Sequence, residues 1–187
     1  MRRGIVVVAV AFAATLIGAC GNGPTIKSFL AKADPACKQG NDLVSVITVP
    51  SDVAGFTDFG TKLADNTNKT VAQLEALKAP SGKNGEGAKA FIAGLKKGAA
   101  DARALAAKAT SGDFPGVEKG AADIQTDFKD ADSKARAYGS TQCGQAQADQ
   151  AAKAAQAAPG AAKKAFIAKA DPICAAANTK VKAIPDP

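Results

Sequence analysis

The feature that most constrains the fold is a long stripe of apolar residues between positions 117 and 138. Its members are spaced alternately by four and three positions: Val117, Ala121, Ile124, Phe128, Ala131, Ala135 and Tyr138. This spacing brings them all to one narrow face of an α-helix, whereas a half-buried strand alternates at every second residue. Gly139 follows the stripe and is a typical helix C-cap. The sequence therefore predicts an amphipathic helix that packs through one face.

Composition extends this prediction along the chain. Aromatic residues are only 5% of the 187 residues, and much of the 47% hydrophobic content is alanine. Alanine favours helices, whereas strands are enriched in β-branched and aromatic residues. Apolar residues also show helical spacing in three more segments, at 26–47, 53–77 and 91–105. With the helix at 117–138, the sequence therefore predicts four helices. We therefore expect an all-α protein, an antiparallel four-helix bundle over residues 26–144.

Proline and glycine mark the expected boundaries. In the first helix, Asp34-Pro35 predicts either a kink or a short helix followed by a new start capped by Asp34. Ser51 is the expected N-cap of the second helix. Residues 82–87 contain three glycines and resemble a phosphate loop only superficially, so we expect a flexible turn there. Residues 145–163 are rich in Ala, Gln and Lys and predict a low-complexity linker.

Residues 1–19 have the pattern of a secretory signal, which is expected to be removed. Arg2 and Arg3 precede an apolar run at 5–17 that is too short to span a bilayer comfortably. The run ends at Cys20 after two small residues, which resembles a bacterial lipobox. The resemblance implies a diacylglycerol on Cys20, with residues 20–25 as a tether at the extracytoplasmic face of the membrane. The alternative is an ordinary signal peptide with an incidental cysteine.

An exported protein meets an oxidising compartment, so the other cysteines are candidates for disulfides. Cys37 shares the apolar register of the first helix, and Cys143 lies just after the fourth. If these helices are neighbours, a Cys37–Cys143 bridge would staple a core that alanine makes thin. Cys174 then remains unpaired, competes with Cys37 for Cys143, or links two chains.

The first helix is partly repeated near the end of the sequence. Residues 27–50 and 164–187 align with an offset of 137 and are identical at twelve of 24 positions. This predicts a truncated tandem duplication, in which residues 164–187 correspond to the first helix of another bundle. They would pack as a fifth helix, exchange with the first helix, or form a loosely docked tail.

Two cysteine motifs carry a family resemblance. They are Phe-x-x-x-Ala-Asp-x-x-Cys-x-x-x-Asn from Phe29 and Ala-Tyr-Gly-x-x-x-Cys-Gly at 137–144. Over about residues 25–145 the chain resembles small Ala-rich secreted lipoproteins of actinobacteria. The resemblance implies a helical bundle closed by Cys37–Cys143 and no established activity. The segment at 164–187 departs from the one-bundle pattern.

The sequence offers little for catalysis. No histidine is present, which removes the commonest general base and metal ligand, so we expect no enzyme, metal or cofactor. The net charge is +7, but residues 20–144 carry only +2, so nucleic acid is not an expected partner. Asp123, Asp127 and Asp130 share one helix side, which favours a solvated face over a carboxylate pair.

We therefore expect a membrane-anchored, non-enzymatic module that binds or scaffolds a protein of the cell envelope. The alternative is a carrier or sensor of a small apolar ligand or lipid held inside the bundle. The candidate lining residues for such a ligand are Phe56, Phe91, Ile92 and Phe128. The sequence predicts no oligomeric state.

Overall fold

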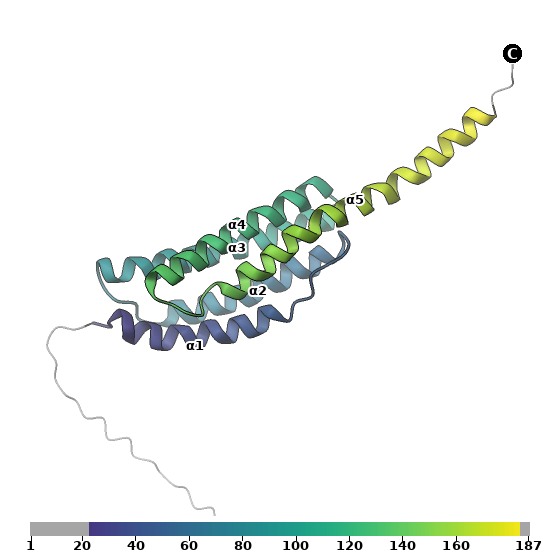
Figure 1. Cartoon of the computed structure of the whole chain (residues 1–187). Coiled ribbons are helices and arrows are strands. Elements are labelled where there is room, and N and C mark those ends of the chain that lie inside the picture. The colour runs from purple at the N-terminus through teal and green to yellow at the C-terminus, as the bar shows by residue number, and fades with distance from the viewer. Residues whose placement is uncertain (1–22, 184–187) are drawn as a thin grey trace, which may run out of the picture.

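The computed structural model describes residues 23–183, and within them every regular element is a helix. The five helices are α1 (Ile26–Ser45), α2 (Gly55–Ala76), α3 (Lys83–Ser111), α4 (Phe114–Tyr138) and α5 (Gln145–Lys182). They pack as a bundle from which the second half of α5 extends into solvent (Figure 1). The all-α helical bundle predicted from the sequence is therefore confirmed.

The α4 stripe forms part of the core as predicted. Its members are buried except Tyr138, which is partly exposed, and Gly139 caps the helix in the left-handed conformation with φ 101°. Helix α3 packs against both α2 and α4. Five fully buried rings fill the space between the helices: Phe29, Phe56, Phe59, Phe91 and Phe128. A few large side chains thus occupy the gaps that the many alanines leave.

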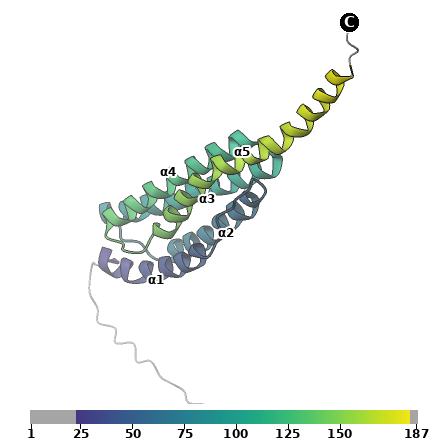
Figure 2. The same ribbon diagram turned by 45° about the vertical axis from the view of Figure 1, so that its right-hand side comes forward.

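Residues 145–163 are not a linker but the packed first half of α5. This half lies beside α4 and α1 and completes the bundle (Figures 1 and 2). Gln150 Nε2 donates a 2.9 Å hydrogen bond to Ser45 O of α1. The linker prediction was wrong because it assumed that a packed helix needs large apolar side chains. Small side chains also pack well, because they let neighbouring helices approach closely. The buried face consists of Gln147, Gln150, Ala151, Ala154, Ala158, Ala161 and Ala162.

Three prolines lie inside helices without ending them. Helix α1 is continuous through Pro35, so a new start capped by Asp34 is wrong. Helix α5 continues through Pro159 and Pro172. A proline removes one backbone hydrogen bond, and the remaining bonds of these long helices keep the helical segments on either side joined. Packing of the 164–187 repeat as a fifth bundle helix is also wrong, because residues 171–183 are exposed.

Two predicted boundaries are displaced. Helix α2 begins at Gly55 rather than after Ser51, and Asp52 Oδ1 accepts a 2.8 Å hydrogen bond from Gly55 N. The glycine-containing segment at 82–87 is not a turn, because α3 begins at Lys83. Gly85 fits against the Pro80 carbonyl there, which leaves no room for a Cβ. Glycine in this segment therefore permits close packing rather than flexibility.

Close approach between α2 and α3 depends on Gly60. A Cβ at this position would overlap Ala102 O and lie 3.1 Å from Ala106 Cβ. We expect Gly60→Ala to lower the free energy of unfolding by about 1–3 kcal/mol, because the helices must separate. Gly160 of α5 faces open space, so a Cβ there meets no other atom. We expect Gly160→Ala to raise the free energy of unfolding by roughly 0.5–1 kcal/mol, because alanine favours the helix more than glycine does. Urea denaturation of both variants tests this, and equal effects would contradict the close approach.

Candidate functional site

A short turn between α4 and α5, residues 139–144, is bonded covalently to α1. Gly139 and Gly144 bound this turn with φ 101° and 89°, conformations that favour glycine. Between them, Cys143 forms a disulfide with Cys37 of α1, with the two Cα atoms 4.8 Å apart. The predicted Cys37–Cys143 bridge is confirmed. It reaches α1 from the α4–α5 turn, and α5 lies beside α1.

Two polar side chains of α1 bind the same turn. Asn41 Nδ2 donates a 2.7 Å hydrogen bond to Gln142 O. Asp34 Oδ1 accepts a 2.6 Å hydrogen bond from Ser140 Oγ. Asp34, Cys37 and Asn41 are spaced by three and four positions, so one helix face carries all three. This face of α1 is therefore built to hold the α4–α5 turn.

The first turn of α1 is anchored by aromatic contacts. The Phe29 ring meets Tyr138 edge-on, with centroids 6.1 Å apart. Tyr138 in turn packs on Phe91, 5.9 Å between centroids, and donates a 2.7 Å hydrogen bond to Asn84 O. Burial raises the pKa of the Tyr138 phenol. These contacts tie the start of α1 to the end of α4 and to α3.

A second face of α1 packs against α2. Gln73 Nε2 donates a 3.1 Å hydrogen bond to Gln39 Oε1. Gly40 lies directly against Thr70, where a Cβ would overlap Thr70 Oγ1 and lie 3.1 Å from its Cβ. Glycine at position 40 therefore sets the distance between the two helices.

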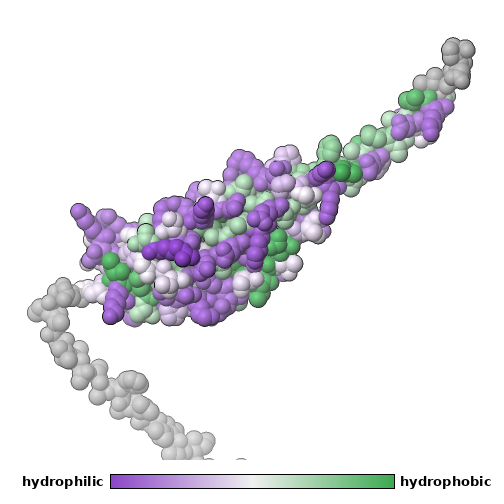
Figure 3. All heavy atoms as spheres, viewed as in Figure 1, coloured by the Kyte–Doolittle hydropathy of each residue, from purple (hydrophilic) through white to green (hydrophobic). Residues whose placement is uncertain are grey.

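The second half of α5, residues 164–182, projects from the bundle, and we call it the projecting segment (Figure 1). Its large apolar side chains are exposed: Phe166 by 66%, Ile173 by 70% and Val181 by 65%. Cys174 is exposed and forms no disulfide. Figure 3 shows apolar residues, in green, among the polar residues of this extension. Sequence reasoning aligned these residues with α1 and left open three arrangements, of which the loosely docked tail with an unpaired cysteine agrees best with these exposed side chains.

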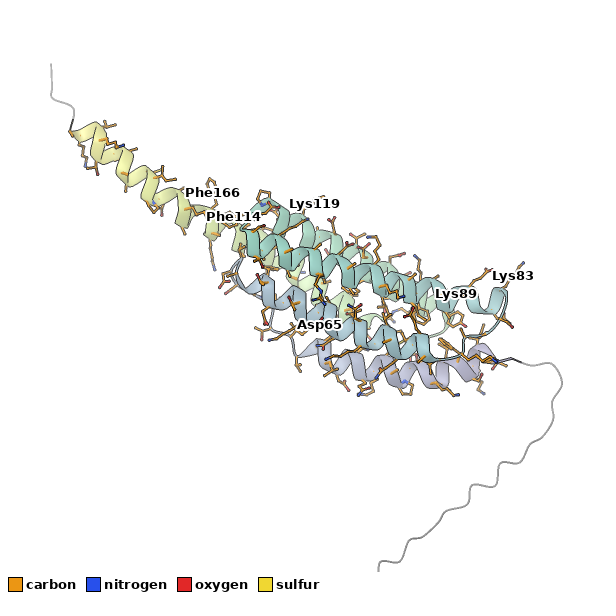
Figure 4. The ribbon with its side chains drawn as sticks, turned by 180° about the vertical axis from the view of Figure 1, so that it is seen from behind. Asp65, Lys83, Lys89, Phe114, Lys119 and Phe166 are labelled. Atoms are coloured by element: carbon orange, nitrogen blue, oxygen red, sulfur yellow. A yellow bond between two sulfur atoms is a disulfide. The ribbon has the colours of Figure 1, made fainter. Side chains whose placement is uncertain are left out.

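A shallow groove lies where the projecting segment leaves the bundle. Phe114 of α4 and Phe166 lie near one another there (Figure 4). The Lys169 ammonium sits 4.4 Å from the centroid of the Phe114 ring, a cation–π contact. The groove, about 310 Å³, is open to solvent. No sequence signal singled out Phe114, because its place depends on the course of α5.

The structure does not bring the four candidate ligand-lining residues together around a cavity. Phe56, Phe91 and Phe128 are fully buried members of the core. Ile92 instead lines an open groove of about 320 Å³ between α2 and α3, with Leu74 among its neighbours. The three rings therefore fill space inside the bundle.

The three aspartates on α4 do not converge. Each pairs with a different lysine: Asp123 with Lys119, Asp127 with Lys97 and Asp130 with Lys134. Lys97 also contacts Asp101, and these two carboxylates raise the pKa of the Lys97 ammonium. Burial, with the neighbouring Asp101, raises the pKa of Asp127. The arrangement is a set of surface ion pairs, each of small effect on stability.

Comparisons with known proteins give no relative: no family model, curated protein or solved structure matches this chain. Within residues 23–183, no helix is long and apolar enough to cross a bilayer. Among the same residues, no three Cys, Asp or Glu side chains are grouped as metal ligands would be. Cys20 and the signal at 1–19 lie outside the described residues. The candidate site is thus the projecting segment together with the α4–α5 turn.

Proposed function

We propose that this chain is a lipid-anchored, non-enzymatic module of the bacterial cell envelope that binds a protein partner through the projecting segment. In this proposal the bundle helices run antiparallel in chain order, and residues 164–187 are a duplicate of the first helix. The proposal rests on one observation: large apolar side chains lie exposed along the projecting segment, in which every residue from Asp171 to Lys182 is exposed within the described part of the chain.

Exposed apolar surface of this kind favours a binding role. Single exposed apolar residues are common, but a continuous row on one element marks interaction sites. Phe166, Ile173 and Val181 lie on one side of the projecting segment, separated by seven and eight positions, and Ala170 and Ala177 lie between them on the same side. An isolated helix is only marginally stable in water, so a partner that covers these side chains would also stabilise the helix.

The anchor part of the proposal is supported by the sequence around Cys20. Two acyl chains give stable membrane attachment where a single chain does not. The tether at 20–25 would keep the bundle within a few nanometres of the membrane, because an extended residue spans at most about 3.6 Å. The partner would therefore belong to the same envelope layer.

The anchor is tested by the intact mass of protein extracted from native membranes. We expect a chain that begins at Cys20 and carries a diacylglyceryl group. Cys20→Ala should move the protein into the soluble fraction. Wild-type protein that is unmodified at Cys20 and released from the membrane would contradict the anchor.

Binding is tested by amide hydrogen exchange of residues 164–182 in native envelopes and in purified monomeric protein. We expect exchange at least about tenfold slower in envelopes, because a covered helix opens less often. Phe166→Asp combined with Ile173→Asp should remove this protection. Ala168→Asp, on the opposite side of the helix, is the matched control. Equally fast exchange in both settings would contradict a binding role.

The alternative of an apolar-ligand carrier has weaker support. Phe56, Phe91 and Phe128 are packed in the core, and the groove beside Ile92 is shallow and open. A ligand site normally surrounds most of its ligand. A lipid that copurifies in equal amount with the monomer would restore this alternative.

A further inference from the structure

The projecting segment keeps the α1 residues that bind the α4–α5 turn. In α1, Phe29, Asp34, Cys37 and Asn41 contact Tyr138 or the turn at 139–144. An offset of 137 places an identical residue at each position of the projecting segment: Phe166, Asp171, Cys174 and Asn178. All four side chains for this contact are therefore present a second time, and residues 171–182, which include three of them, are exposed throughout.

The residues that face α2 are not kept. Gln39, Gly40 and Leu43 of α1 lie beside α2. The corresponding residues of the projecting segment are Ala176, Ala177 and Lys180. If the projecting segment only paired with another apolar helix, Asp171 and Asn178 would make no specific contact. The pattern instead fits a helix that still recognises an α4–α5 turn.

We propose that the projecting segment of one copy takes the place of α1 in a second copy of this chain, with Cys174 bonded to Cys143 of that copy. The inference rests on the proposed function, because it names the partner of the projecting segment. Phe166 would meet the Tyr138 ring, and Asn178 would donate to the Gln142 carbonyl, as Phe29 and Asn41 do within one chain.

The covalent step is a thiol–disulfide exchange. The Cys174 thiol loses its proton, and its thiolate attacks Cys143 Sγ of the second copy. A Cys174–Cys143 bond forms, the Cys37–Cys143 bond breaks, and Cys37 leaves as a thiolate that takes up a proton. One disulfide replaces another, so no oxidant is consumed. Because Cys143 is buried, the exchange waits for α1 to open locally.

A second copy fits this role better than the segment's own bundle. Helices α1 and α5 run in the same direction, and α5 begins beside the second half of α1, where Cys37 and Asn41 hold the α4–α5 turn (Figures 1 and 2). A segment folded back from Gly160 would therefore run opposite to α1 and could not reproduce its contacts. A second copy can approach in either direction. Because the two contacting surfaces differ, repeated exchange would link copies head to tail.

One residue limits the exchange. Ala177 stands where α1 has Gly40, and its Cβ would overlap Thr70 of the second copy's α2. The chain's own α1 has no such overlap and is also linked to α2 by residues 46–54. Helix α1 is therefore the preferred occupant, and exchange proceeds when copies are concentrated, as lipid anchoring to one membrane would make them.

The experiment uses the full mature chain, purified without reductant and incubated at high concentration at about pH 8, a condition in which thiol–disulfide exchange is commonly followed. Non-reducing peptide mapping of covalent dimers identifies the bond. We expect a Cys143–Cys174 peptide together with free Cys37. A Cys174–Cys174 peptide as the only new bond, or monomer alone with free Cys174, would overturn the inference.

Matched variants of the exposed segment test the contacts without disturbing the bundle. Asn178→Ala should lower the yield of the Cys143–Cys174 dimer about fivefold through one lost hydrogen bond, whereas Lys180→Ala should not. Ala177→Gly should raise the yield at least about fivefold by removing the overlap with Thr70. Ala176→Gly, with the same loss of helix propensity, should not raise it. Unchanged yields in Asn178→Ala and Ala177→Gly would overturn the inference.

Failure of this inference is distinguishable from failure of the proposed function. Slow amide exchange of residues 164–182 in native envelopes without any Cys143–Cys174 bond would leave a binding module whose partner is another protein. Fast exchange in native envelopes would remove the binding function itself.

Discussion

Replacing Cys37 and Cys143 together with serine, in a Cys174→Ser background, is expected to lower the free energy of unfolding by about 4–5 kcal/mol. The bridge joins residues 106 positions apart, so it removes much of the conformational freedom of the unfolded chain. For a chain of this size the loss corresponds to a fall in melting temperature of roughly 10–20 °C. Calorimetry and urea denaturation without reductant measure both quantities.

Both proteins in this comparison carry Cys174→Ser, so that no disulfide through Cys174 forms between two chains and changes the measured stability. Cys174→Ser alone should leave stability unchanged, because Cys174 is exposed and unbonded. A loss below about 1 kcal/mol in the triple variant would mean that helix packing alone holds the bundle. In that case α1 would not depend on its bridge to the turn.

The disulfide shows how a sequence prediction can be right while its geometry is incomplete. The pairing of Cys37 with Cys143 followed from treating the first and fourth helices as neighbours in a four-helix bundle. In the structure α5 packs against both α4 and α1, and Cys143 reaches α1 from the turn that precedes α5. The pairing held because that turn directly follows α4, so its position depends little on the fifth helix.

Helices that contain large apolar residues were predicted correctly, whereas the packing of the alanine-rich helix was not. The α4 stripe contains Val117, Ile124 and Phe128, whose spacing identifies one buried face. The first half of α5 contains no large apolar residues. Because alanine occurs on every side of this helix, the spacing of its apolar residues does not identify a buried face. Its buried face is defined only by the helices around it. For the projecting segment the sequence was ambiguous for a different reason, because Phe166 and Val181 match Phe29 and Val44, which α1 buries.

Ala158→Glu is expected to lower the free energy of unfolding by about 2–5 kcal/mol at pH 7. Ala158 is fully buried on the packed half of α5, so a glutamate there must lose its hydration or push the helix away. Burial would raise the pKa of this carboxyl in the folded state above its unfolded value. Stability should therefore recover as the pH falls toward about 4 and be lost again as it rises, because the protonated acid is easier to bury.

Gln156→Glu is the matched control, since it adds the same carboxyl at an exposed position two residues earlier. It should change stability by less than about 0.5 kcal/mol and add no comparable recovery at acid pH. Hydrogen exchange should localise the damage in Ala158→Glu to residues 147–162 and to α1, which these residues help to cover. If Ala158→Glu behaved like Gln156→Glu, residues 145–163 would be the linker that their composition first indicated, and α1 would be held by α2, by Tyr138 and by the α4–α5 turn without help from α5.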